Sequence, residues 1–175
     1  MRIAFSGTSS TGKTTTANLL KERGLLDKLG LQLLRNKDSR SKLSKKVDEL
    51  TLDEKLTFQN SCFMDKKIFE SNQDNYIVER SFVDLLAYRS FISPIPTNEE
   101  INAHIILAKQ YDLHFFFPYG IISYESDGFR PTDEYSKKVS EKIFEILNSN
   151  DIYYITLNSS SLDDRCKIII TRFLN

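Results

Sequence analysis

Short apolar runs alternate with longer segments of helical periodicity along the whole chain. The apolar runs predict β-strands at residues 2–6, 31–34, 76–78, 113–117 and 152–157. Apolar residues that recur three or four positions apart predict helices over residues 13–23, 51–71, 82–92, 97–111, 132–147 and 161–173. Strands that alternate with helices favour a parallel sheet with helices on both faces. We therefore expect a three-layer α/β fold with a parallel sheet of about five strands.

Capping residues mark where several of these helices begin. Thr51 with Glu54, and Thr97 with Glu100, match the capping box, in which each side chain bonds to the other residue's backbone N–H. Thr132 is a further helix cap. The apolar stripe of the helix after Thr51 is predicted to consist of Leu56, Phe58, Cys62, Phe63 and Phe69.

Composition and charge narrow the class of protein. The chain has 175 residues, which predicts one domain over residues 1–175. Lys plus Arg and Asp plus Glu both number 24, which argues against indiscriminate binding of nucleic acid through a uniformly basic surface. No apolar run is long enough to span a membrane. We expect a soluble, cytoplasmic protein, and the oligomeric state stays open.

One motif carries the chemistry. Residues 7–14, GTSSTGKT, match G-x-x-x-x-G-K-[ST] at every position, between a predicted strand and a predicted helix. In such a phosphate loop, backbone N–H groups and the helix N-terminus face phosphate oxygens. Lys13 is expected to bridge the β- and γ-phosphates and Thr14 to ligate Mg²⁺. The predicted ATP-binding residues are Gly7, Thr8, Ser9, Ser10, Thr11, Gly12, Lys13, Thr14 and Thr15.

The rest of the chain separates the classes of nucleotide-binding protein. Asn36-Lys37-Asp38-Ser39 departs from the guanine-reading N-K-x-D motif and lies too early for a GTPase. A motor or remodelling ATPase usually has a longer apolar strand that ends in adjacent acids, together with a larger body. These comparisons favour a small phosphotransferase.

Two further segments resemble a known family. Residues 76–88, YIVERSFVDLLAY, resemble the acid–Arg motif after the third strand of P-loop nucleoside and nucleotide kinases, including thymidylate and deoxynucleoside kinases. Residues 127–130, DGFR, resemble the lid of a related group that contains the ribosylnicotinamide kinase domain and small phage-type P-loop kinases. The resemblance spans about residues 1–157 and implies the P-loop kinase fold, with a lid at about 119–132.

The resemblance implies four catalytic residues: Lys13, Glu79, Arg80 and Arg130. Glu79, at the end of a strand beside the phosphate loop, is placed to hold Mg²⁺ or its water, or to act as base. Arg80 is expected to face the acceptor or the transferred phosphate. Arg130 is expected to close over the site from the lid. The implied metal ligands are Thr14 and Glu79, and the implied cofactors are ATP and Mg²⁺.

The acceptor side is less well marked. Asp38, Arg40 and Asp84 are weaker candidates for acceptor binding. The aromatic residues Phe58, Phe63, Tyr88 and Phe91 can stack a base, although aromatic residues at helical spacing more often belong to the core. Residues 35–46 contain six basic residues and one acid, which suits an anionic acceptor such as a nucleoside monophosphate or a nucleic-acid strand.

Three functions therefore stay open. The leading one is transfer of phosphate from Mg-ATP to a nucleoside, a nucleotide or a similar small acceptor. The first alternative is a kinase that phosphorylates a hydroxyl in DNA or RNA. The second is a regulatory module that binds ATP and hydrolyses it slowly or not at all.

Overall fold

The five strands among the described residues belong to one parallel sheet. The computed structural model describes residues 1–35, 43, 45, 49–125 and 132–174. The sheet order is β2-β3-β1-β4-β5, and every pairing is parallel. The strands are β1 (Arg2–Ser6), β2 (Gln32–Leu34), β3 (Tyr76–Glu79), β4 (Leu113–Phe116) and β5 (Tyr154–Thr156). Since the carboxyl ends of β1 and β3 lie side by side, the residues that follow them meet at one edge of the sheet.

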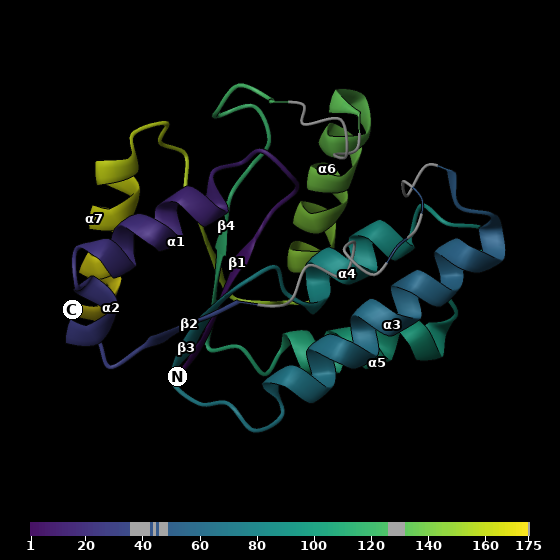
Figure 1. Ribbon diagram of the computed structural model, residues 1–175, viewed down its shortest axis with the longest axis horizontal. Coiled ribbons are helices and arrows are strands. Elements are labelled where there is room, and N and C mark those ends of the chain that lie inside the picture. The colour runs from purple at the N-terminus through teal and green to yellow at the C-terminus, as the bar shows by residue number, and fades with distance from the viewer. Residues whose placement is uncertain (36–42, 44, 46–48, 126–131, 175) are drawn as a thin grey trace.

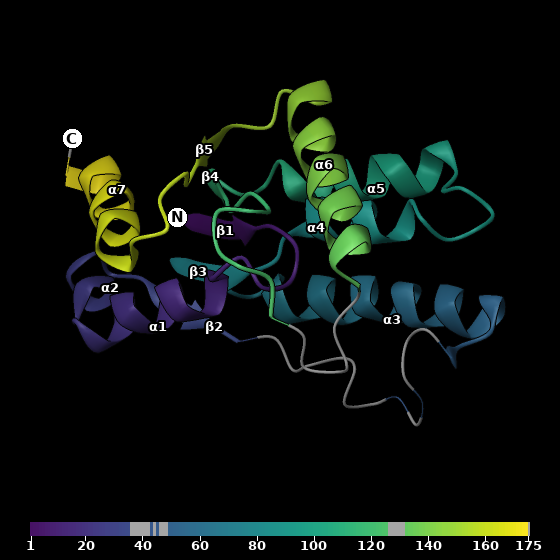
Figure 2. The same cartoon turned by 90° about the horizontal axis from the view of Figure 1, so that it is seen from above.

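Helices cover both faces of the sheet, as the sequence predicts (Figure 1). One face carries α1 (Lys13–Glu22), α2 (Leu25–Lys28) and α7 (Leu162–Leu174), and Figure 2 shows them apart from the other group. The other face carries α3 (Leu52–Glu70), α4 (Phe82–Arg89), α5 (Asn98–Ala108) and α6 (Asp133–Ser149). None of the helices among the described residues is long and apolar enough to cross a membrane.

Alternate residues of the central strands form two separate cores. Ala4 and Val78 pack under α3–α6, whereas Ile3, Phe5 and Ile77 pack under α1, α2 and α7. A strand that is buried on both faces needs apolar residues at every position, which explains the continuous apolar runs in the sequence.

Several local predictions are confirmed, and two are wrong. The capping boxes at Thr51 and Thr97 are present, and Thr132 caps α6. The short helix α2 was not expected, because the sequence predicts no element between the helix at 13–23 and the strand at 31–34. The predicted stripe of α3 is wrong at Phe69, which is 37% exposed, whereas Phe63 packs against the core. The buried residues of this helix are Lys66 and Glu70. These two charges have polar partners in the interior, which periodicity alone does not reveal.

Candidate active site

The phosphate loop runs from the end of β1 to the start of α1, and two glycines are required by its shape. Gly7 has φ +151°, and a Cβ there would lie 2.5 Å from the carbonyl oxygen of Phe117. Gly12 has φ +82°, and a Cβ there would lie 2.5 Å from Nη1 of Arg165. Both positions therefore combine a backbone conformation that favours glycine with a lack of room for a side chain.

The side chain of Lys13 lies inside the loop. Its Nζ donates to the carbonyl oxygen of Thr8 and to Oγ1 of Thr11, the latter at 3.1 Å. Lys13 is buried, although it is the first residue of α1. A cation that is fixed at a helix N-terminus, beside the backbone N–H groups of a loop, forms a binding site for phosphate oxygens.

Thr14 and Glu79 meet at the open side of the loop. The Thr14 hydroxyl donates to Oε2 of Glu79 at 2.5 Å, which joins α1 to the end of β3. Both side chains offer the hard oxygen donors that Mg²⁺ prefers. The described residues contain no cluster of three or more His, Cys, Asp or Glu side chains suited to a metal. This donor set therefore fits Mg²⁺ that takes its remaining ligands from phosphates and water.

Arg80 follows directly after β3 in an unusual backbone conformation. Its φ is +65°, in the left-handed region that residues with a Cβ seldom adopt. Its backbone N–H donates to the carbonyl oxygen of Phe5 at 2.8 Å. The guanidinium lies 5.2 Å from the centre of the Tyr88 ring, and Nη2 lies 3.5 Å from Oγ of Ser9. Arg80 thus reaches toward the phosphate loop, and its contact with the acceptor or the transferred phosphate stays a prediction.

Asp84 is fully buried and joins the phosphate loop to the start of α4. Its Oδ1 accepts from the N–H of Gly7 at 2.7 Å. Its Oδ2 accepts from the N–H of Ser81 at 2.7 Å and from the Ser81 hydroxyl at 2.9 Å. The carboxylate therefore holds the loop in place, and the predicted contact with an acceptor stays a prediction.

The described part of the predicted lid lies over the phosphate loop. The hydroxyl of Ser10 donates to the carbonyl oxygen of Glu125 at 3.0 Å, and the Ile122 side chain approaches Gly12. The predicted residues Asp38, Arg40 and Arg130 lie outside the described residues.

Sequence reasoning missed Arg165, which supports the loop from α7. This fully buried residue donates from Nη1 to the carbonyl oxygen of Thr11 at 2.9 Å and from Nε to that of Ser159 at 2.5 Å. Burial lowers the pKa of its guanidinium. Its spacing of three residues from Leu162 and four from Ile169, which places it on the same helix face as these apolar residues, was the available signal.

Comparison with known proteins agrees with this architecture. A family model described as an AAA domain matches residues 2–165. No curated protein matches the chain.

Several solved structures have a similar fold. Thymidylate kinase from Ehrlichia chaffeensis has a TM-score of 0.69 at 18% identity, and the match covers 100% of this chain and 98% of that one. Deoxyadenosine kinase from M. mycoides with bound dATP has a TM-score of 0.64 at 13% identity, and the match covers 100% of both chains. The YorR protein from Bacillus subtilis, in complex with phosphorylated GDP, has a TM-score of 0.57 at 13% identity over 98% of this chain and 95% of that one. At these identities the likeness establishes a shared fold.

Proposed function

This chain belongs to the AAA-domain family, and we propose that it is a kinase that transfers the γ-phosphoryl group of Mg-ATP to a nucleoside, a nucleotide or a similar small acceptor. One observation carries the proposal. Lys13, the Thr14–Glu79 pair and Arg80 converge at the carboxyl ends of β1 and β3. They supply the phosphate-binding cation, the metal ligands and a second cation that phosphoryl transfer needs.

On the donor side, the loop holds the triphosphate and Lys13 neutralises its β- and γ-phosphates. Thr14 and Glu79 are the residues that would hold Mg²⁺, which balances phosphate charge when it is bound. The acceptor oxygen forms a bond to the γ-phosphorus, and the bond from that phosphorus to the β–γ bridging oxygen breaks. ADP leaves with the electron pair of the broken bond, while Arg80 binds the transferred group.

The nature of the acceptor decides what Glu79 does. A phosphate acceptor attacks through an oxygen that already carries negative charge, so Glu79 serves the metal alone. A hydroxyl acceptor loses a proton on transfer, and Glu79 is the carboxylate placed to receive it. Tyr88 lies next to Arg80 and begins a row of rings that offers aromatic faces for a base. The ring centres are 6.2 Å apart for Tyr88–Tyr135 and 5.5 Å apart for Phe91–Tyr135.

The decisive experiment is a screen for ADP production with Mg-ATP. The acceptors are nucleosides, nucleoside monophosphates, nicotinamide riboside and oligonucleotides. We expect turnover with a nucleoside or a monophosphate, and a loss of about 100- to 1,000-fold in Lys13→Ala, because a cation that contacts the transferred group is removed. Lys21→Ala, on the exposed last turn of the same helix, is the matched control and keeps full activity.

The other outcomes identify the alternatives. Phosphate transfer from ATP to an oligonucleotide, with binding that weakens in salt, indicates a nucleic-acid kinase. ATP binding without turnover, unchanged in Glu79→Gln, indicates a regulatory module. Full activity of Lys13→Ala contradicts the phosphate-loop assignment itself.

A further inference from the structure

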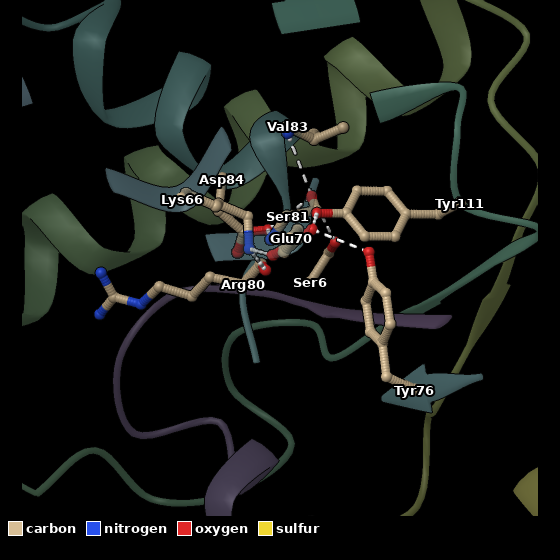
Figure 3. Close-up of polar contacts among 9 residues, drawn as sticks. All are labelled: Ser6, Lys66, Glu70, Tyr76, Arg80, Ser81, Val83, Asp84 and Tyr111. Carbon is tan, nitrogen blue, oxygen red and sulfur yellow. Dashed lines mark hydrogen bonds and ion pairs between the residues drawn. The ribbon is translucent and has the colours of Figure 1, made fainter. Parts of the chain in front are cut away.

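A buried polar cluster lies behind Arg80, on the face of the sheet that α3 and α4 cover (Figure 3). Lys66 and Glu70, one turn apart on α3, are each only 5% exposed. Lys66 Nζ donates to Oε1 of Glu70, and Oε2 of Glu70 accepts from the hydroxyls of Tyr111 at 2.6 Å and Tyr76 at 3.0 Å. Burial and the Glu70 carboxylate raise the pKa of both tyrosines, so both remain donors. Glu70 thus anchors Lys66 at a fixed point.

Lys66 makes a second contact, and this one leads to the active site. Its Nζ donates to the backbone carbonyl oxygen of Arg80 at 2.8 Å. The next amide, the N–H of Ser81, donates to Oδ2 of Asp84 at 2.7 Å. The peptide group between Arg80 and Ser81 is therefore held at its oxygen from α3 and at its N–H from α4. Two buried side chains from different helices fix the orientation of one peptide plane.

The N–H of Arg80 is held by the carbonyl oxygen of Phe5 and its own carbonyl by Lys66, so the φ of Arg80 is fixed and with it the direction of the side chain. With φ at +65°, Arg80 has a conformation that a residue with a Cβ keeps only where its surroundings impose it. Figure 3 shows the side chain of Arg80 extending away from the cluster. The guanidinium lies over Tyr88 and near Ser9 of the phosphate loop. A change of φ to the ordinary range would send the guanidinium in another direction.

We propose that Lys66 is a positioning residue, which holds the Arg80 carbonyl so that the Arg80 guanidinium faces the phosphoryl group in transfer. This inference rests on the proposed function, since it gives Arg80 the task of binding that group. It explains why a lysine occupies the interior of α3: a hydrogen bond to a carbonyl is strongest where water cannot compete for it. The phosphate loop itself keeps its own support from Asp84.

The test is a kinetic double-mutant cycle with Lys66→Met and Arg80→Ala. We expect Lys66→Met to lower kcat by up to about 100-fold, because a small displacement of a catalytic group is costly. The KM for ATP should change less than about threefold, because the interactions that hold ATP remain. In the Arg80→Ala background, Lys66→Met should lower kcat less than about threefold, because the two residues act as one unit.

Two further variants separate positioning from stability. Lys66→Met alone leaves the Glu70 carboxylate buried without its cationic partner. The double variant Lys66→Met/Glu70→Gln removes the negative charge of Glu70 and keeps a hydrogen-bond acceptor for both tyrosines. It should lose kcat as Lys66→Met does. Tyr76→Phe is the matched control, since it removes a hydrogen bond from the same cluster and leaves the Lys66–Arg80 contact. It should lower the Tm and keep kcat.

The inference is overturned if Lys66→Met keeps the wild-type kcat, or if it lowers kcat equally with and without Arg80. Inactivity of the wild-type protein with every acceptor would instead contradict the proposed function. A crystal structure of Lys66→Met then tests the positioning role on its own. Arg80 leaving the left-handed region supports that role, and an unchanged φ refutes it.

Discussion

The backbone of Gly7 serves both the fold and the phosphate loop, through its N–H and through the absence of a side chain. Its N–H donates to Asp84, and a Cβ at this position would meet the carbonyl oxygen of Phe117. Phe117 is itself fixed, because its N–H donates to the carbonyl oxygen of Ser6 at 2.8 Å. A side chain at position 7 would therefore meet backbone that has no room to move.

We expect Gly7→Ala to lower the free energy of unfolding by about 1–3 kcal/mol, through strain and the close contact. ATP affinity should fall about tenfold or more, because the displaced N–H groups no longer face the phosphates. Chemical denaturation and calorimetric titration with ATP measure the two effects. Gly30→Ala is the control: it has a similar positive φ of +66° with open space around it, so it should lose stability without losing ATP affinity.

At the scale of elements, α7 acts as a support for the phosphate loop as well as a cover for the sheet. Arg165 donates to the loop at Thr11, and its guanidinium lies 5.4 Å from the centre of the Phe117 ring. Its Nη2 is buried without a hydrogen-bond partner among the described residues. A buried cation with an unmet donor contributes little net stability. The role of Arg165 is therefore to hold the phosphate loop in its binding conformation rather than to stabilise the fold.

Arg165→Met tests this division of roles. Methionine keeps most of the apolar contact and loses both hydrogen bonds, so ATP should bind about tenfold more weakly while the Tm changes little. Lys167→Met, two residues away with its side chain 77% exposed, should bind ATP as the wild type does. Unchanged ATP affinity in Arg165→Met would show that the contact with Thr11 is incidental.

For the whole molecule, the buried polar groups make stability depend on pH. His114 is fully buried in β4 and hydrogen-bonds to Ser6 and to the carbonyl oxygen of Ala108, each at 3.1 Å. Burial lowers its pKa from 6.5 to about 4. Between these values the unfolded chain binds a proton that the folded protein does not. The contribution of neutral His114 to the free energy of unfolding is therefore fully present above pH 6.5 and is lost as the pH falls toward 4.

We expect His114→Asn to reduce the slope of the unfolding free energy against pH between pH 4.5 and 6.5 by up to about 1.4 kcal/mol per pH unit. Denaturation curves at several pH values measure that slope. Burial also lowers the pKa of His104, so we expect His104→Asn to reduce the same slope of unfolding free energy against pH. A slope in His114→Asn equal to that of the wild type would assign the acid sensitivity to other groups.

The sequence predicts best what is encoded by neighbouring residues. The phosphate loop, the strand that ends at Glu79 and the capping boxes each lie within a few residues, so their patterns are visible without the fold. Lys66 and Glu70 were not predicted, because their partners come from other parts of the chain. Lys66 bonds to the carbonyl oxygen of Arg80, and Glu70 bonds to Tyr76 and Tyr111. Arg165 likewise contacts Thr11, which lies 154 residues away in the sequence. A charged residue is usually solvated, and only the tertiary structure identifies the exceptions.

Asp84 has a consequence for how this protein can evolve. The same carboxylate closes the capping box of α4 and fastens the first N–H of the phosphate loop. A lineage that lost catalysis could change Lys13 or Glu79, whereas a change of Asp84 would also remove the buried hydrogen bonds that cap α4 and hold the loop. Relatives that have lost their activity should therefore keep this aspartate, and its presence marks common descent rather than a working enzyme.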